Sequence, residues 1–356
     1  MTGCIDCKME TQGLKRFVKE EKEGRYWIIP LLLLVAFLPA VTDEYYLSVI
    51  SLCGVYVVAA VGLDILTGIC GQISLGHGAF MAVGAYTYGF LTNMAVSPCL
   101  AFLAGGVVSA ITGFIVGLPA LRIKGLYLAI ITLGCVFITN DLVLYFGDYT
   151  GGHNGMVIPT AALGSLVFDT TVKKYYLIWI LSVLGIVAGR LLKHSKPGRA
   201  FSYIRFSEVA AEVNGVSLPF YKTLAFSLGC FYAGIAGCLL GITNGFIGME
   251  DFSINTSLLM LIMLIIGGTG SIYGAAIGAV VMMFILPEGI DRITEYVTFI
   301  KPEDFESLLF GSLTLIFIIL EPSGIYGRWT IIRNYWKAFP LNEVQVKRVK
   351  WIRRWR

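Results

Sequence analysis

The chain has 356 residues, of which 56% are hydrophobic and only 14% are charged, and its formal net charge is +4. With a mean hydropathy of +0.77, it falls outside the range of soluble globular proteins, and its basic residues sit in separate loops and not in the patch of a nucleic-acid-binding protein. The apolar runs are long enough to cross roughly 30 Å of hydrocarbon, unlike the short alternating segments of a membrane β-barrel. We therefore expect an all-α, polytopic transmembrane helical bundle.

Residues 1–27 are polar and mixed in charge, and the apolar run after them lacks the small-residue cleavage pattern of a signal peptide. We expect a cytoplasmic N-terminal tail there, a membrane domain over 28–327 and a basic cytoplasmic tail over 328–356. About ten spans or half-spans are predicted, and two of them, 255–268 and 272–287, are short enough to be paired half-spans. The candidate runs are 28–42, 45–66, 78–96, 99–120, 125–146, 174–192, 223–246, 255–268, 272–287 and 307–321.

Orientation follows from the placement of Lys and Arg, which favour cytoplasmic loops. Ten crossings put all the basic connections on one side, so both termini are predicted to be cytoplasmic. The basic segments are the N-terminal tail, the turn with Arg122 and Lys124, the 193–222 interval and the tail after Arg328. The acidic connections, predicted to face outward, contain Asp43, Glu44, Asp148, Glu250, Asp251 and the 287–306 segment.

Residues 71–80, GQISLGHGAF, interrupt an apolar run with glycines. Irregular backbone at membrane depth persists only where it is buried in protein or lines a watery cavity. The polar side chains here are either part of a translocation path or hydrogen-bonding groups that satisfy a broken helix. The residues concerned are Gly71, Gln72, Ser74, Gly76, His77 and Gly78.

Small residues recur every fourth position in three later runs. Such columns let membrane helices approach closely, and they indicate either simple bundle packing or a sliding interface for alternating access. The columns are Gly105, Ser109, Gly113 and Gly117; Gly229, Ala233, Gly237, Gly241 and Gly245; and Gly274 with Gly278.

A glycine-dense turn, TGGHNG, falls in a loop that the charge pattern places outside the membrane. We interpret it as an outer loop that either contacts a partner protein or acts as a gate. Its residues of interest are Thr150, Gly151, Gly152, Asn154 and Gly155. His153 has no second ligand placed near it, so no metal site is predicted.

The 193–222 interval is a polar, net basic island between apolar runs. Phe206, Val209, Ala210 and Val213 fall at helical spacing and predict a short helix with one narrow apolar face. Arg205, Glu208 and Glu212 occupy its other face. Gly215 stands where a left-handed residue would end the helix, and Pro219 follows to stop it. The interval is either a docking element that pushes on a partner or a solvated loop.

A second glycine break, GGTGSIYGAAIGA over 267–279, separates the two short candidate spans and contributes Gly267, Gly268 and Gly270 as further path or broken-helix residues. The chain carries no GxxxxGK[ST], HExxH or GxSxG motif, and Asp64 and Asp141 lie near span ends and not at mid-depth. We expect no catalytic residue, no metal and no cofactor in this chain. A lone CxxC at Cys4 and Cys7 lacks the further ligands that zinc needs.

These stretches together resemble the integral membrane permeases of ABC importers for branched-chain amino acids, specifically the high-affinity leucine/isoleucine/valine M-type subunit. The resemblance covers about 62–329, and six landmarks occur in order: 71–80, LRIKGLYLAIITL at 121–133, 150–155, 198–215, 267–279 and EPSGIYGRW at 321–329. It implies a multi-pass protein of a prokaryotic cell (plasma) membrane that is not itself an enzyme.

The resemblance also implies partners: a homologous second permease, two cytoplasmic ATP-binding subunits that hold the ATP, and an extracytoplasmic substrate-binding protein. The 193–222 loop then seats in the ATPase, with Arg199, Arg205, Glu208 and Gly215 as matched positions. The usual importer pattern of EAA followed by Gly is only partly met, because the acid is shifted to Glu208. The tails lie outside the resemblance and are expected to bind anionic membrane lipid.

Two alternatives remain at this level. A related permease for urea, short amides or other amino acids would share the same landmarks, because these belong to scaffold and coupling. A self-contained secondary carrier or channel would need ionisable groups at mid-depth, which the apolar runs lack.

Overall fold

The computed structural model describes residues 38–40, 42–120, 125–163, 166–289, 311–312, 315 and 324–337. The chain divides into two compact units, residues 1–48 and 49–356. In the first, the 3-10 helix η1 (Leu38–Ala40) precedes the start of α3 (Glu44–Leu63), and the Thr42 hydroxyl donates to the Leu38 carbonyl at 2.8 Å. Most of the predicted spans 307–321 and 28–42, the Arg122 turn and Cys4 with Cys7 lie outside the described residues.

The second unit is almost wholly helical where the structure describes it, which agrees with the predicted all-α class. The structure also contains two antiparallel pairs of two-residue strands that the sequence did not predict: β1 (Met156–Val157) with β4 (Phe246–Ile247), and β2 (Ala162–Leu163) with β3 (Leu166–Val167). After α3, the helical elements are the π-helical η2 (Asp64–Ile69), α4 (His77–Asn93), α5 (Pro98–Ala120), α6 (Leu126–Tyr145), α7 (Gly147–Thr150), η3 (Gly152–Asn154), α8 (Thr171–His194), α9 (Lys196–Phe206), α10 (Glu208–Val213), α11 (Leu218–Asn244), η4 (Met249–Phe252), α12 (Ile254–Gly267), α13 (Ile272–Val280), the π-helical η5 (Val281–Ile285) and α16 (Gly324–Lys337).

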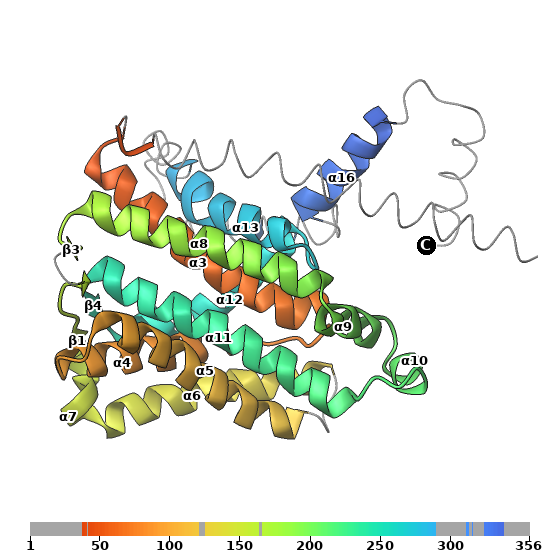
Figure 1. Ribbon diagram of the computed structural model, residues 1–356, viewed down its shortest axis with the longest axis horizontal. Coiled ribbons are helices and arrows are strands. Elements are labelled where there is room, and N and C mark those ends of the chain that lie inside the picture. Colours follow the sequence, from red (N-terminus) through yellow and green to blue (C-terminus); the bar gives the residue numbers. More distant parts are fainter. Residues whose placement is uncertain are drawn as a thin grey trace, which may run out of the picture. The chain divides into compact units, whose positions relative to one another are not determined.

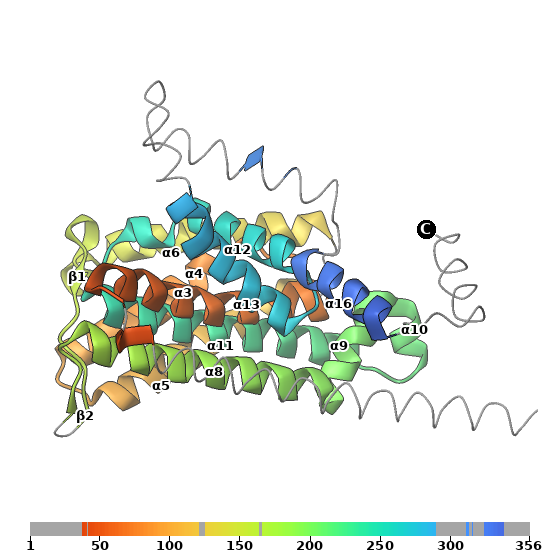
Figure 2. The same ribbon diagram turned by 90° about the horizontal axis from the view of Figure 1, so that it is seen from above.

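Six helices in the described part are long and apolar enough to cross a membrane. They are Glu44–Ile69, Pro98–Pro119, Tyr127–Tyr145, Thr171–His194, Leu218–Asn244 and Ile272–Gly289. The helices α4 and α12 are shorter, with 17 and 14 residues. Both views of the ribbon show these helices sharing one general direction (Figures 1 and 2).

Backbone-to-backbone packing joins α4, α5 and α11, and it explains the small-residue columns. A Cβ on Gly237 of α11 would overlap the Met81 carbonyl of α4, and one on Gly84 would overlap Gly234. A Cβ on Gly113 of α5 would lie 2.5 Å from the Cβ of Cys230. A side chain at these positions would collide with the neighbouring helix, so the columns of α5 and α11 serve bundle packing, which is one of the two predicted interpretations.

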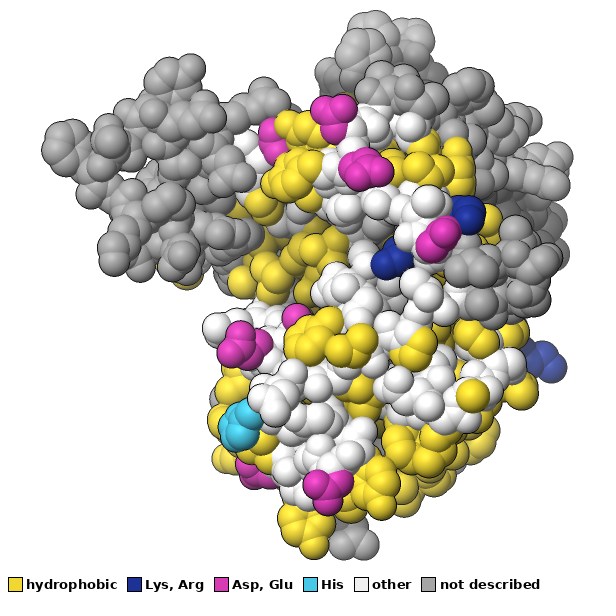
Figure 3. Space-filling view, turned by 90° about the vertical axis from the view of Figure 1, so that its left-hand side faces the viewer, with side chains coloured by type: hydrophobic (Ala, Val, Ile, Leu, Met, Phe, Trp, Pro, Cys, Tyr) yellow, Lys and Arg dark blue, Asp and Glu magenta, His cyan; other side chains and the backbone are white. Residues whose placement is uncertain are grey.

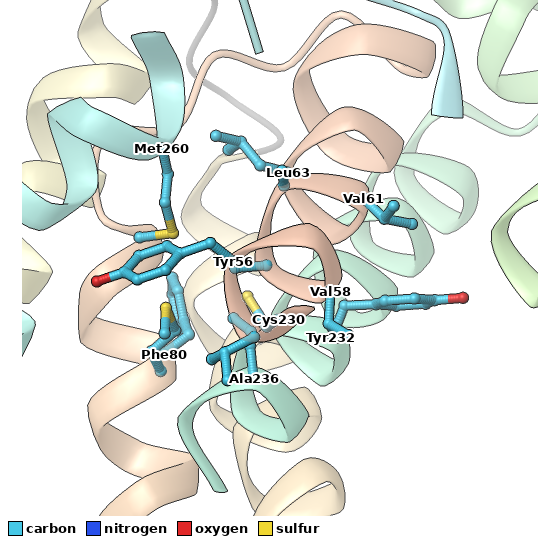
Figure 4. Packing of buried hydrophobic residues seen from close by; sticks show 14 of the residues in the cluster. Tyr56, Val58, Val61, Leu63, Phe80, Cys230, Tyr232, Ala236 and Met260 are labelled. Carbon is cyan, nitrogen blue, oxygen red and sulfur yellow. The ribbon is translucent and has the colours of Figure 1, made fainter. Parts of the chain in front are cut away.

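The core of the unit is built on α3, whose side chains from Val55 to Leu63 are nearly all buried. Figure 4 shows Tyr56 of this helix directed toward Met260 of α12 and Phe80 of α4, while Val58 lies beside Tyr232 of α11. The Phe80 ring also meets Phe226 edge-on at 5.7 Å between centroids. Four helices therefore share one apolar interior.

The outward sides of α5, α6 and α8 are exposed and apolar. Hydrocarbon or another membrane protein can cover such surfaces, whereas water would not. The large exposed side chains are Leu100, Leu103, Val107, Ile111, Phe114, Ile115 and Leu118 on α5; Ile130, Phe137, Ile138 and Leu142 on α6; and Ile180, Leu184 and Leu191 on α8.

The two ends of this unit differ in charge. One end, here the basic end, contains the last turn of α8, α9, α10 and the first turn of α11, with Lys193, Lys196, Arg199, Arg205 and Lys222. The other, the acidic end, contains α7, β1, β4 and η4. Figure 3 views that end and shows more Asp and Glu than Lys and Arg side chains. The charge asymmetry matches the predicted separation of loops, apart from Lys173 and Lys174, which begin α8 at the acidic end.

Candidate functional site

The basic island folds into two helices, so the prediction of one continuous helix through Phe206 and Val213 is wrong. α9 ends at Phe206, and Ser207 starts α10 because its hydroxyl accepts the Ala210 N–H at 3.3 Å. This N-cap satisfies a backbone donor that would otherwise have no partner. The predicted end is correct, since Gly215 has φ +78°, and Pro219 lies in the first turn of α11.

The predicted apolar residues of the island point away from the bundle despite the break. Phe206, Val209 and Val213 are 88%, 71% and 82% exposed, and Ala210 is exposed with them. Ala211, on the opposite side, is buried. A protein surface seldom leaves such a cluster uncovered, and these side chains form a short apolar ridge, hereafter the ridge.

Glu208 is paired within the chain. Its Oε1 lies 2.6 Å from Nζ of Lys222, whose side chain is only 5% exposed. A buried ammonium needs such a partner because its desolvation is costly. Glu208 therefore ties α10 to α11, and this internal contact competes with the role predicted for it toward a partner. Arg199 donates to the His194 carbonyl at 3.2 Å on the exposed side of α9.

Arg205, in the last turn of α9, is an exposed residue whose side chain reaches back to two segments of the bundle. Its Nη1 donates to the Gly68 carbonyl in η2, and its Nη2 lies 3.5 Å from Oγ1 of Thr269. Its side-chain carbons also lie against Gly71, where φ is +80° and a Cβ would crowd them. Arg205 thus contacts both glycine-rich segments that the sequence singles out, the first through its side-chain carbons at Gly71 and the second through its guanidinium at Thr269. Its hydrogen bond to Gly68 falls three residues before the first segment.

Both backbone polar groups of Gly270, its N–H and its carbonyl, are hydrogen-bonded to ionisable side chains. Oδ1 of Asp64 accepts its N–H at 2.6 Å, and Nζ of Lys193 donates to its carbonyl at 2.6 Å. Asp64 is fully buried, and it is the residue that the sequence places merely near a span end. Asp64, Lys193 and Arg205, with the backbone that they hold at Gly68 and Gly270, form what we call the coupling node.

The second break depends on glycine because helices meet there without side chains between them. A Cβ on Gly267 would overlap the Gly274 carbonyl, and Gly324, the first residue of α16, packs against Gly268. Gly268 and Gly270 both have positive φ, at 114° and 82°. The predicted path residues Gly267, Gly268 and Gly270 are therefore a tight turn between α12 and α13.

The first break turns the chain back alongside α3. Nε2 of His77 donates to the carbonyl of Ala59, which precedes the end of η2 by ten residues, so α4 starts about 15 Å back along α3. Leu75 N–H donates to Oγ1 of Thr132 at 2.9 Å, and a Cβ on Gly76 would overlap the Thr132 carbonyl. The segment is thus non-helical backbone that packs against other helices, with Gln72, Ser74 and Gly76 buried and with Gly71 and Ile73 exposed.

Some polar groups of this break fit the interpretation that they satisfy the backbone of a broken helix, and others remain compatible with a translocation path. The Ser74 hydroxyl accepts the Gly76 N–H at 3.4 Å and serves the local backbone. Oε1 of Gln72 and Nδ1 of His77 are buried and have no hydrogen-bond partner among the described residues. Gly78 N–H donates to Oγ of Ser257 at 3.0 Å, so the first turns of α4 and α12 meet.

The TGGHNG turn has a packing role that explains its composition. Gly151, Gly152 and Gly155 all have positive φ. A Cβ on Gly155 would overlap the ring of Phe246, and Oγ1 of Thr150 donates to the Val143 carbonyl at 2.6 Å. Asn154 and His153 are exposed. In the described part of the chain no three His, Cys, Asp or Glu side chains gather as metal ligands would.

The sequence reasoning missed Lys193, Thr269 and Lys222 and undervalued Asp64. Lys193 and Lys222 are the ends of a basic segment, so the sequence alone suggests that they are solvent-exposed charges of a loop. Asp64 and Gly68 are four residues apart, so they share a helix face, which is a weak signal of a polar contact. Nothing local shows that their partners lie in the second break.

The family model for the branched-chain amino acid transport system permease component matches residues 45–318. The chain is similar to the high-affinity branched-chain amino acid transport system permease protein LivM of Escherichia coli (strain K12), with 29% identity over 328 residues that cover 85% of this chain and 74% of the relative. It is also similar to the high-affinity branched-chain amino acid transport system permease protein LivH of the same strain, with 26% identity over 78% of this chain and 93% of the relative. Its similarity to the ribose import permease protein RbsC of that strain is 22% identity over 77% of this chain and 88% of the relative. No solved structure matches. The chain therefore belongs to the family of permease components of branched-chain amino acid transport systems.

Proposed function

We propose that this chain is the membrane-spanning subunit of an ATP-driven importer and forms the path for branched-chain aliphatic amino acids. The permease family and the relatives LivM and LivH support the substrate class. The observation that carries the mechanism is the contact of Arg205 with both glycine breaks, at Gly71 through its side-chain carbons and at Thr269 through its guanidinium. Because the exposed ridge follows Arg205 directly, a partner that moves the ridge also moves the node.

In this proposal the basic end faces the cytoplasm, as the positive-inside rule favours. Two ATP-binding subunits cover the ridge, and their closure on ATP shifts α9 and α10. Arg205 transmits the shift to Gly68 and Thr269, while Lys193 and Asp64 keep Gly270 in register. The turn between α12 and α13 then moves relative to α3, which changes access to the path. A sister permease and an extracytoplasmic binding protein complete the importer.

Reconstitution tests this directly. Proteoliposomes that contain the chain, its sister permease and both ATPases should take up leucine, isoleucine or valine only with ATP and the binding protein. Urea, short amides and ribose serve as competing solutes, because the likeness to RbsC shows that related scaffolds carry other cargo. Gradient-driven uptake by the purified chain alone would contradict the proposal.

Cross-linking tests the docking role of the ridge. A Val209→Cys variant should cross-link to an ATPase subunit and react with thiol reagents only from the cytoplasmic side. Phe137→Cys is the matched control, since Phe137 is 54% exposed on the apolar face of α6. Reaction of the Val209→Cys thiol from outside the cell would reverse the assigned orientation.

A further inference from the structure

One carboxylate in a membrane-spanning helix points away from the bundle. Asp141 lies in α6, four residues before this helix ends at Tyr145, and it is exposed. None of the described residues forms a hydrogen bond or an ion pair with it. At a rise of about 1.5 Å per residue, Asp141 lies about 6 Å short of the helix end. Hydrocarbon offers a charged side chain no partner, so carboxylates inside membrane spans face protein or water.

The packing of α6 fixes the orientation of this carboxylate. Ala129 and Thr132 are buried on the side of α6 that faces the bundle. Oγ1 of Thr132 accepts the Leu75 N–H at 2.9 Å. Asp141 follows Thr132 by nine residues, or about two and a half helical turns, so the two side chains lie on opposite sides of the helix. Rotation of α6 to bury the carboxylate would therefore expose Thr132 and break its bond to Leu75.

Four large side chains share the outward face of α6 with Asp141. They are Ile130, Phe137, Ile138 and Tyr145, and each is more than half exposed. Steps of about 3.6 residues, or multiples of that number, relate them to Asp141, so the five residues lie on one face of the helix. We call these five residues the α6 stripe. Figure 1 shows α6 at the edge of the bundle, where a neighbouring membrane protein can reach it.

The outward sides of two other spans lack such a charge. Every exposed residue between Leu100 and Leu118 of α5, and between Leu177 and Leu191 of α8, is apolar. Lipid chains alone can cover these surfaces. The α6 stripe needs a cover that is apolar along most of its length and supplies a hydrogen-bond donor or a cation opposite Asp141. A transmembrane helix with one such side chain near its end meets both requirements.

We propose that the α6 stripe is the surface on which the sister permease packs, through a membrane helix that donates a hydrogen bond to Asp141. The inference rests on the proposed function, because that function requires the sister subunit. The ATP-binding subunits do not fit as the cover, since the ridge lies at the basic end and Asp141 lies toward the acidic end. A soluble delivery protein cannot reach Ile130 or Phe137 inside the span.

Photo-cross-linking in the assembled importer tests which protein covers the stripe. The photoreactive residue benzoylphenylalanine replaces Phe137 or Ile138, and the importer is illuminated in its membrane. Both positions should give adducts with the sister permease. Ile111 of α5 and Leu184 of α8, which are 54% and 57% exposed, are the matched control positions and should give lipid adducts.

Three outcomes of the cross-linking would overturn the inference. The first is the absence of a sister adduct from both Phe137 and Ile138. The second is an equal yield of sister adduct from Ile111 and Leu184, because the stripe would then have no special role. The third is an adduct only with a second copy of this chain or with an ATPase subunit.

Variants of Asp141 test the polar part of the contact. Asp141→Leu should lower the amount of sister permease that co-purifies with the chain by about tenfold or more, the usual effect of losing a hydrogen bond to a charged group. Asp141→Asn keeps an acceptor oxygen and should lower it less. Asp148→Leu, which changes an exposed carboxylate of α7 beyond the span, is the control and should leave it unchanged.

The melting temperature of the chain purified alone separates an interface from a fold defect. Because no described residue pairs with Asp141, Asp141→Leu should leave this temperature unchanged or raise it. A lowered melting temperature would show that Asp141 acts within the fold, and unchanged recovery of the sister in Asp141→Leu would show that the carboxylate faces lipid or water. Either result overturns the inference.

Failure of the inference and failure of the proposed function have different signatures. If the stripe cross-links to the sister but the reconstituted importer moves no branched aliphatic amino acid, the proposed function fails and the interface stands. If the importer moves these amino acids with ATP but the stripe gives no sister adduct, the inference fails and the proposed function stands.

Discussion

Oδ1 of Asp64 accepts a 2.6 Å hydrogen bond from the N–H of Gly270, a residue 206 positions later in the chain. Asp64→Ala should remove this contact and leave the Gly270 N–H without its acceptor, at a cost of about 1–3 kcal/mol. The free energy of unfolding, measured in detergent, should fall accordingly. Asp64→Asn keeps an acceptor oxygen and should cost less; equal losses in both variants would show that the hydrogen bond is not what matters.

Arg205 should be needed for coupling more than for folding. Arg205→Lys keeps the charge but loses the planar fork that reaches Gly68 and Thr269 together, so it should not restore function. In Arg205→Ala and Arg205→Lys we expect ATP-driven uptake to fall by about tenfold or more, the equivalent of about 1.4 kcal/mol of lost coupling. Lys196→Ala, which removes an exposed cation of α9 that is not among the matched positions, is the control, and an equal loss there would argue against a specific role for Arg205.

The ridge should tolerate size changes but not charge. Val209→Asp or Val213→Asp puts a carboxylate into an apolar contact, where desolvation disfavours it. Co-purification of the ATPase subunits should be lost while the chain still inserts and remains folded. Glu212→Gln, an exposed neighbour, should retain the subunits. Retention of the ATPases in both aspartate variants would place their docking surface elsewhere.

Glycine packing should be essential where helices touch and dispensable elsewhere. Gly237→Ala would drive a methyl group into the Met81 carbonyl, and overpacking of this kind costs about 1–3 kcal/mol. Gly134→Ala in α6 meets nothing within 4 Å and should stabilise the helix by about 0.5–1 kcal/mol. Thermal denaturation of the two purified variants should show a lowered melting temperature for Gly237→Ala and a raised one for Gly134→Ala. Destabilisation of similar size in both would count against helix contact as the cause.

The helical membrane class and the three glycine columns follow from sequence because hydropathy and small-residue spacing are local signals. The break at Ser207 was also within reach, since Ser followed by Glu208 is a helix-start pattern. The pairing of Asp64 with Gly270 could not be predicted, because no local pattern specifies which of the two glycine breaks a buried carboxylate will contact. Lys222 was hidden for the same reason, since its burial depends on how α11 lies against α10.

The close approach of α4, α5 and α11 also constrains how the transport cycle can proceed. Helices that interlock through backbone atoms cannot slide without collision, so these three should behave as a stator during turnover. The moving parts would then be α9 and the turn between α12 and α13, and α10 would move with them only if its Glu208–Lys222 contact with α11 opens. Two spin labels placed on α4, α5 or α11 should keep the same separation when nucleotide is added. The separation between one label on these helices and one on α13 should change.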